Sequence, residues 1–125
     1  MKYYSISEAS AKLNIPESTL PYYEKKGLLP LIERDATGRR LFSEDQITLL
    51  EIVIYLKNTH MSINDIKQYV DWVVEGDKTT LLRLEMLKSH KQTVLAEISL
   101  MTESLKGIDV KITTYTKRTQ ERKEE

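Results

Sequence analysis

Residues 5–27 read SISEASAKLNIPESTLPYYEKKG, and this stretch predicts two short helices joined by a tight turn. Ser5 and Glu8 have the spacing of a capping box, which starts the first helix. Asn14 tolerates the left-handed backbone that such a turn requires, and Pro16 suits the first turn of a following helix. We therefore expect a compact helical pair at the start of the chain.

A small β-hairpin is expected after Gly27, the glycine that ends the second helix. Ile32 and Leu41 are β-forming residues, and they flank the turn-rich segment 35–38. Phe42, next to Leu41, is predicted to lie in the core. Together, two helices and a hairpin form the pattern of a winged helix-turn-helix, in which the second helix enters a DNA groove.

Two further helices are predicted between residues 43 and 76. Ser43 caps the first of them, whose body, 47–56, is apolar almost all round and is therefore expected to be central and buried. Ser62 caps the second, which is expected to end at Gly76 and Asp77.

The last segment has the clearest periodicity, because apolar residues recur at alternating three- and four-residue steps for more than four heptads. The predicted dimerisation contacts are Leu84, Leu87, Val94, Ile98, Met101, Leu105, Ile108 and Ile112. Lys91 and Tyr115 complete the pattern. Each buried leucine or isoleucine contributes roughly 1.5–3 kcal/mol, which favours pairing with a second copy of the chain. The alternative is a helix that folds back onto its own bundle.

These patterns predict a mainly α-helical fold. We expect a winged helix-turn-helix head over residues 1–76, a coiled-coil dimerisation helix over 77–116, and a polar tail over 117–125 that frays.

Composition narrows the function classes. The 125-residue chain has 19 basic and 19 acidic side chains and no cysteine, which excludes disulfides, cysteine zinc sites and thiol switches. Its start lacks the apolar core of a signal peptide, and no apolar run approaches bilayer length, so we expect a soluble cytoplasmic protein. No glycine-rich phosphate loop or nucleophile–base pair is present, so we predict neither an enzyme nor a cofactor. His60 and His90 are too isolated to predict a metal site.

Three motifs in the expected order resemble the MerR family of transcription regulators. They are TLPYYEKKGLLP at residues 19–30, GRRLF at 38–42 and LKNTHMSINDI at 56–66. The resemblance covers residues 3–75, and the coiled coil continues it. It implies a homodimer, held by an antiparallel coiled coil, that binds a pseudo-palindromic promoter. It also implies that the dimer bends and untwists the promoter spacer for RNA polymerase, which is a form of indirect readout.

The candidate DNA contacts follow from this resemblance. The second helix offers Thr19, Tyr22, Tyr23 and Lys25. The wing offers Arg34 and Arg40 from the resemblance, and Arg39 from its place at the edge of the loop. The segment 56–66 is similar to the family's second wing, and Lys57 within it and Lys67 just after it are further candidates. Tyr23 has the alternative of a core ring, and the lysines have the alternative of ordinary surface charge.

The chain departs from the family pattern at three positions. Pro21 stands where the family usually has arginine, which removes a cation and predicts local strain near Leu20. Arg39 replaces a tyrosine of the wing. His60 replaces a glycine, so a positive φ there would be strained.

The sequence names no inducing signal. Tyr69, Trp72 and Val73 could line a pocket for a small ligand, although aromatic residues on a helix are usually core. We expect no globular sensor after the coiled coil, which leaves a small apolar ligand, a partner protein or simple abundance as the regulator.

Two other functions stay open. One is an architectural or excisionase-like factor that bends DNA without polymerase. The other is a coiled-coil adaptor whose head has lost DNA binding, a change that Pro21 makes conceivable.

Overall fold

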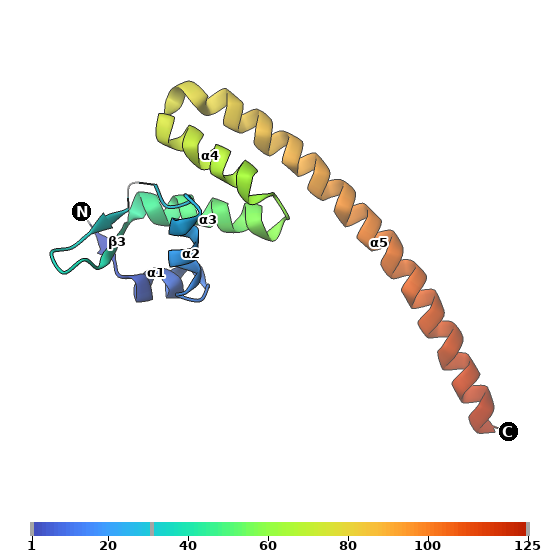
Figure 1. Cartoon of the computed structure of the whole chain (residues 1–125). Coiled ribbons are helices and arrows are strands. Elements are labelled where there is room, and N and C mark those ends of the chain that lie inside the picture. Colours follow the sequence, from blue (N-terminus) through green and yellow to red (C-terminus); the bar gives the residue numbers. More distant parts are fainter. Residues whose placement is uncertain (1, 31, 125) are drawn as a thin grey trace. The chain divides into compact units, whose positions relative to one another are not determined.

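The structure is a computed structural model that describes residues 2–30 and 32–124. The chain forms two compact units, of which the first ends at Met86 and the second begins at Leu87. The described strands, the shorter helices and the first turns of helix α5 belong to the first unit, and the rest of α5 supplies the second (Figure 1). The predicted fold, mainly helical with a small wing and a long C-terminal helix, is confirmed.

The elements follow one another in a simple order. They are β1 (Tyr3–Tyr4), α1 (Ile6–Leu13), α2 (Thr19–Lys25), β2 (Glu33–Arg34), β3 (Arg40–Ser43), α3 (Glu44–Asn58), α4 (Ile63–Glu75), the 3₁₀ turn η1 (Asp77–Thr79) and α5 (Thr80–Glu124).

The predicted helix caps are present. The Ser5 hydroxyl accepts a hydrogen bond from the backbone N–H of Glu8, and the Glu8 carboxylate accepts one from the N–H of Ser5 at 2.9 Å. Asn14 ends α1 in the left-handed conformation with φ of 55°. Ser43 and Ser62 cap α3 and α4 by accepting a backbone hydrogen bond in the same way. The starts of these helices are therefore determined by local side chain–backbone hydrogen bonds.

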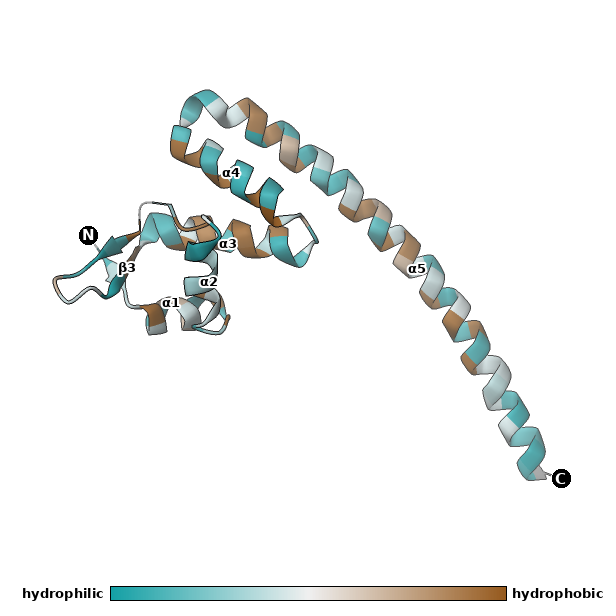
Figure 2. Cartoon of the chain, viewed as in Figure 1, coloured by the Kyte–Doolittle hydropathy of each residue, from teal (hydrophilic) through white to brown (hydrophobic). Residues whose placement is uncertain are grey.

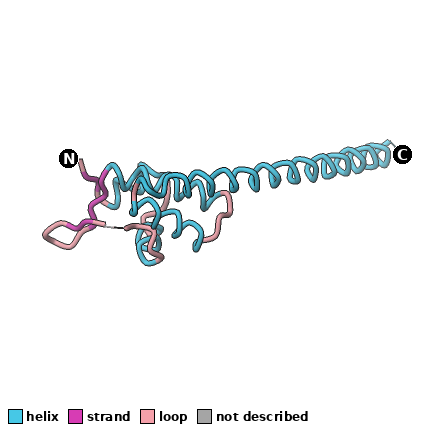
Figure 3. The backbone as a smooth tube through the Cα atoms, turned by 90° about the horizontal axis from the view of Figure 1, so that it is seen from above, coloured by secondary structure: helices cyan, strands magenta, loops and turns pink. Residues whose placement is uncertain are grey.

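The wing is part of a three-stranded antiparallel sheet in the order β1-β3-β2. The predicted hairpin pairs β2 with β3, with Arg34 opposite Arg40. The strand β1 was not predicted, because two residues are too short to show an alternating pattern. It pairs Tyr4 with Phe42, so this short strand closes the open edge of the hairpin (Figure 3).

The core of the first unit is formed by buried side chains of helices α1 to α4 and of strand β3. Phe42 is fully buried, as predicted. Its fully buried companions include Leu20, Leu28, Leu50, Val53, Ile66 and Val70. The prediction that 47–56 is buried all round was wrong, because Tyr55 is 63% exposed and only one face of α3 is covered. Helices α1 and α4 pack against α3, and the residues of α3 that are fully buried, Leu50 and Val53, face the core.

Helix α5 is longer than expected. It begins at Thr80, after η1, and continues to Glu124, so the described part of the polar tail is helical. Lysine, arginine, glutamine and glutamate are good helix formers, which explains why the helix persists there. No helix within residues 2–30 and 32–124 has the combination of length and hydrophobicity that a membrane-spanning segment needs.

Two glycines should respond in opposite directions to replacement by alanine. Gly27 ends α2 with φ of +78°, and a Cβ there would lie 2.9 Å from Cε of Lys67. Gly27→Ala should therefore destabilise the fold by about 1–2 kcal/mol, the cost of a left-handed L residue. Gly107 lies inside α5 with open space around it, so Gly107→Ala should stabilise the helix by about 1 kcal/mol. Thermal unfolding followed by circular dichroism measures both, and equal signs would contradict this assignment.

Candidate nucleic-acid interface

The exposed face of α2 combines an aromatic ring with positive charge. Tyr22 is 44% exposed, and Lys25 and Lys26 are exposed beside it. The ammonium of Lys26 lies 5.7 Å from the centre of the Tyr22 ring. Thr19, at the start of the helix, is half-buried. This face therefore offers hydroxyl and cationic groups of the kind that bond phosphates or base edges.

Tyr23 points the other way. It is 5% exposed, and burial raises the pKa of its hydroxyl. Its ring lies 6.0 Å from that of Tyr22 and is tilted by 46°. The core therefore covers nearly all of the Tyr23 side chain, as the core-ring alternative requires. Tyr23 is the weakest of the four candidate DNA contacts on α2.

Pro21 lies in the first turn of α2, as the third residue of the helix. The N–H groups of a first turn have no partner inside the helix, so proline removes no helical hydrogen bond here. Leu20, beside it, is fully buried, and its N–H donates to the carbonyl oxygen of Glu17. The missing arginine thus affects the charge of this face more than the geometry of the helix.

The tip of the wing is built by Asp35. Its carboxylate accepts hydrogen bonds from the hydroxyl of Thr37 at 2.7 Å and from the backbone N–H of Arg39 at 2.9 Å. These hydrogen bonds lower the pKa of Asp35 below its usual value, with that from the Thr37 hydroxyl contributing most. Gly38 completes the turn with φ of +85°. The Arg39 side chain is left exposed at the end of a well-defined loop.

Glu24 joins α2 to the wing. Its carboxylate accepts hydrogen bonds from Nη2 of Arg34 at 2.9 and 3.2 Å, and from Nε and Nη2 of Arg40 at 3.3 Å each. Nη1 of Arg34 also donates to the carbonyl oxygen of Gly38 at 2.9 Å. One carboxylate on the helix therefore holds both of the wing arginines that were predicted as phosphate contacts. We call these three residues, Glu24, Arg34 and Arg40, the Glu24 cluster.

The second-wing candidates lie around the α3–α4 connection. Lys57 is exposed in the last turn of α3. Lys67 forms an ion pair with Asp71 at 3.1 Å, and its aliphatic part lies against Gly27 at the end of α2. His60, in the connection itself, has φ of 70°, which is the left-handed conformation that is strained for a residue other than glycine.

The three residues predicted as a ligand pocket all lie on α4. Tyr69 is buried, while Trp72 and Val73 are half-buried. The carbonyl oxygen of Trp72 accepts a hydrogen bond from the hydroxyl of buried Thr79. Tyr69 thus fits the core alternative, and the pocket stays a prediction.

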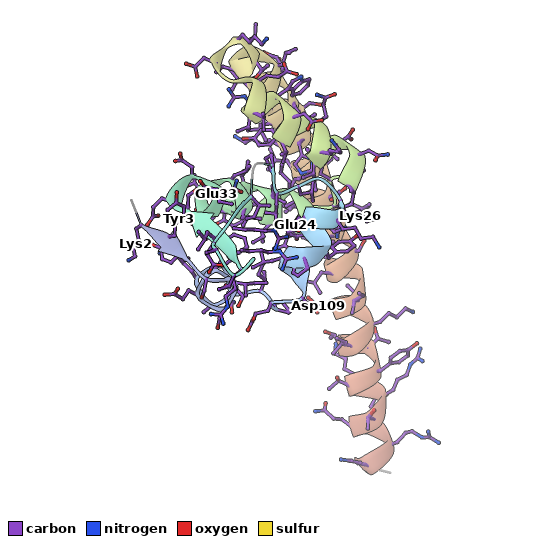
Figure 4. All side chains as sticks on the ribbon, turned by 60° about the vertical axis from the view of Figure 1, so that its left-hand side comes forward. Lys2, Tyr3, Glu24, Lys26, Glu33 and Asp109 are labelled. Atoms are coloured by element: carbon purple, nitrogen blue, oxygen red, sulfur yellow. The ribbon has the colours of Figure 1, made fainter. Side chains whose placement is uncertain are left out.

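Two residues of this face were missed by sequence reasoning. Lys26 could have been found from its spacing of four residues after Tyr22, which places the two side chains together on a helix. Glu24 gave no such local signal, because its partners lie 10 and 16 residues away along the chain. Figure 4 labels both residues: Glu24 lies in α2, and Lys26 is the residue that caps its C-terminal end.

Helix α5 carries an exposed apolar stripe. Brown bands recur along this helix in Figure 2. The exposed members of the predicted dimerisation set are Leu84, Ile98, Met101, Leu105, Ile108 and Ile112, and Leu87 and Val94 are half-buried. Ile98, Met101, Leu105 and Ile108 border one apolar hollow together with Thr102 and Ser104. Contiguous exposed apolar surface of this kind marks an interaction site.

The described side chains form no candidate metal site. Within residues 2–30 and 32–124, no three histidine, aspartate or glutamate side chains are placed so that they could hold one ion together.

Comparison with known proteins identifies the family of this chain. The family model for MerR HTH family regulatory proteins matches residues 4–71. An uncharacterised HTH-type transcriptional regulator of Haemophilus influenzae is 33% identical over 114 residues, which are 91% of this chain and 84% of the relative.

Two solved structures are similar over nearly the whole chain. One is a MerR family transcriptional regulator from Bacillus thuringiensis, with a TM-score of 0.84 and 39% identity over 90% of this chain and 99% of that one. The other is HiNmlR, a MerR family regulator lacking the sensor domain, bound to promoter DNA. Its TM-score is 0.84, with 33% identity over 93% of this chain and 92% of that one. With its helix-turn-helix, its wing and its long C-terminal helix, this chain belongs to the MerR family of transcriptional regulators.

Proposed function

We propose that the protein is a homodimeric regulator that binds a pseudo-palindromic promoter in the cytoplasm and bends and untwists the spacer between the half-sites. The observation that carries this proposal is the joining of α2 to the wing, which places the exposed Tyr22 and the arginines of the hairpin on connected elements. A recognition helix and a basic wing that move together can contact base edges and phosphates at once.

The proposed DNA contacts are the predicted set, with the exposed Lys26 added. Thr19, Tyr22 and Lys25 act from α2. Arg34, Arg39 and Arg40 act from the wing. Lys57 and Lys67 act as flanking phosphate contacts, and Tyr23 contributes through its place in the core. The similarity to HiNmlR, a MerR family regulator bound to promoter DNA, supports DNA as the partner of these residues.

The proposed dimer forms through the apolar stripe of α5. Ile98 and Leu105 are 55% and 57% exposed in the single chain, and a second copy of α5 in antiparallel orientation would cover them. Two heads held at a fixed separation match a symmetric site, because half-site spacing mirrors protein symmetry. The bending of the spacer then depends on contacts to both half-sites and on the cost of deforming the DNA between them.

Footprinting on the DNA upstream of the chain's own gene, with and without RNA polymerase, tests this function. We expect two protected half-sites related by a dyad, enhanced cleavage in the spacer where the duplex is bent, and a polymerase footprint on the same promoter. A bent but promoter-free site would identify an architectural factor instead. The absence of any protected site would indicate an adaptor without DNA binding.

A further inference from the structure

We propose that Glu24 is a positioning residue for DNA binding: it holds Arg34 and Arg40 so that both guanidinium groups present N–H donors to the phosphate backbone. This inference rests on the proposed function. It adds a residue that fixes the orientation of the wing relative to the recognition helix. The sign of its effect is unusual, because an acidic residue is expected to strengthen the binding of a polyanion.

The geometry leaves donors available. A guanidinium has five N–H donors on three nitrogens. Arg34 uses Nη1 and Nη2 for Gly38 and Glu24, so its Nε makes none of these bonds. Arg40 uses Nε and Nη2 for Glu24, so its Nη1 makes none of them. Each arginine can therefore stay bonded to Glu24 while it donates to a phosphate.

The charge of the Glu24 cluster stays favourable for DNA. Two guanidinium groups share one carboxylate, which leaves one surplus positive charge at the junction of α2 and the wing. Without Glu24 the two cations, which are opposite each other in the β2–β3 register, would repel. The carboxylate also limits the rotamers of two long side chains, so less conformational entropy is lost when a phosphate binds.

The burial of the three groups is partial. The side chains of Glu24 and Arg40 are 24% and 26% exposed, and that of Arg34 is 43% exposed. An isolated surface ion pair of this exposure contributes little to folding. The network should therefore affect the orientation of the wing and its arginines much more than the stability of the head.

The test compares Glu24→Gln with Glu17→Gln. Glu17 is exposed just before α2, and its replacement removes the same charge from the same end of the head. Affinity is measured by fluorescence anisotropy as a function of salt, on a labelled duplex that contains the upstream region of the chain's own gene. We expect Glu24→Gln to bind about tenfold more weakly, within the usual range of coupling in a connected network. The slope of log affinity against log salt concentration, called the salt slope below, should also become less steep. We expect it to fall by about one per subunit for each phosphate that the arginines no longer bind. Glu17→Gln should bind as well as or better than the parent.

A second comparison separates positioning from damage to the fold. In a chain that already carries Arg34→Ala and Arg40→Ala, Glu24→Gln should cause no further loss of affinity, because its effect acts through the two arginines. A further loss of affinity in that background would overturn the inference, and so would a Glu24→Gln variant that binds as tightly as the parent. In both cases salt-dependent binding by the parent would leave the proposed function intact. A parent without salt-dependent binding would overturn both.

Discussion

Replacing Ile98 and Leu105 together by aspartate is expected to yield monomers that bind DNA at least about 100-fold more weakly than the parent, within the range that linked binding sites can supply. Both residues are more than half exposed in the single chain. Each lies four residues after another member of the stripe, and the two are seven residues apart. In the proposed dimer they would be buried against the partner helix. A buried, unpaired carboxylate is strongly unfavourable, so the helices should separate. The loss of affinity follows because the second head no longer binds as part of the same molecule.

The chain offers a matched control on the same helix. Leu100 and Val110 are 70% and 63% exposed, and both lie outside the heptad seam. Leu100→Asp with Val110→Asp introduces the same charges, yet it should leave the dimer intact. Sedimentation equilibrium of the purified proteins distinguishes the two pairs. A dimer that survives the seam substitutions, or dissociates equally with the control, would contradict the assignment of the stripe.

Replacing Arg40 by alanine should weaken binding to every DNA sequence, and by about tenfold or more for a dimer in which both wings are changed. Arg40 is bonded to Glu24 and lies opposite Arg34 in the hairpin. Its removal takes away a phosphate donor, and Glu24 keeps one arginine partner, so the head should remain folded. The salt slope should fall by about one per subunit.

Lys78→Ala is the comparison for Arg40→Ala. Lys78 is exposed in η1, outside both α2 and the wing, and its removal changes the total charge by the same amount. Its salt slope should match that of the parent. An unchanged slope for Arg40→Ala would remove this arginine from the set of phosphate contacts.

Local structure was largely predictable from the sequence, because the starts of three helices are encoded by a serine and a residue three positions later. The hydroxyls of Ser5, Ser43 and Ser62 accept the backbone hydrogen bonds that this spacing predicts. The turn at Asn14 and the hairpin tip at 35–38 were equally readable, since few residue types suit a left-handed backbone or a tight turn.

Tertiary pairing was less predictable. Two neighbouring tyrosines on α2 look alike in the sequence, yet Tyr22 is exposed and Tyr23 is buried, because the direction of the core decides between them. The strand β1 exists only because β3 offers it an edge. The Glu24 cluster depends on two contacts between residues that are far apart in the sequence. Periodicity and capping rules describe neighbours along the chain and contain no information about such contacts.

Sedimentation of the protein on a single duplex that spans both proposed half-sites tests the central claim most directly. The account predicts two chains on each duplex across the whole range of protein concentration at which binding occurs. Complexes that hold one chain per duplex would contradict a dimer that binds as a unit.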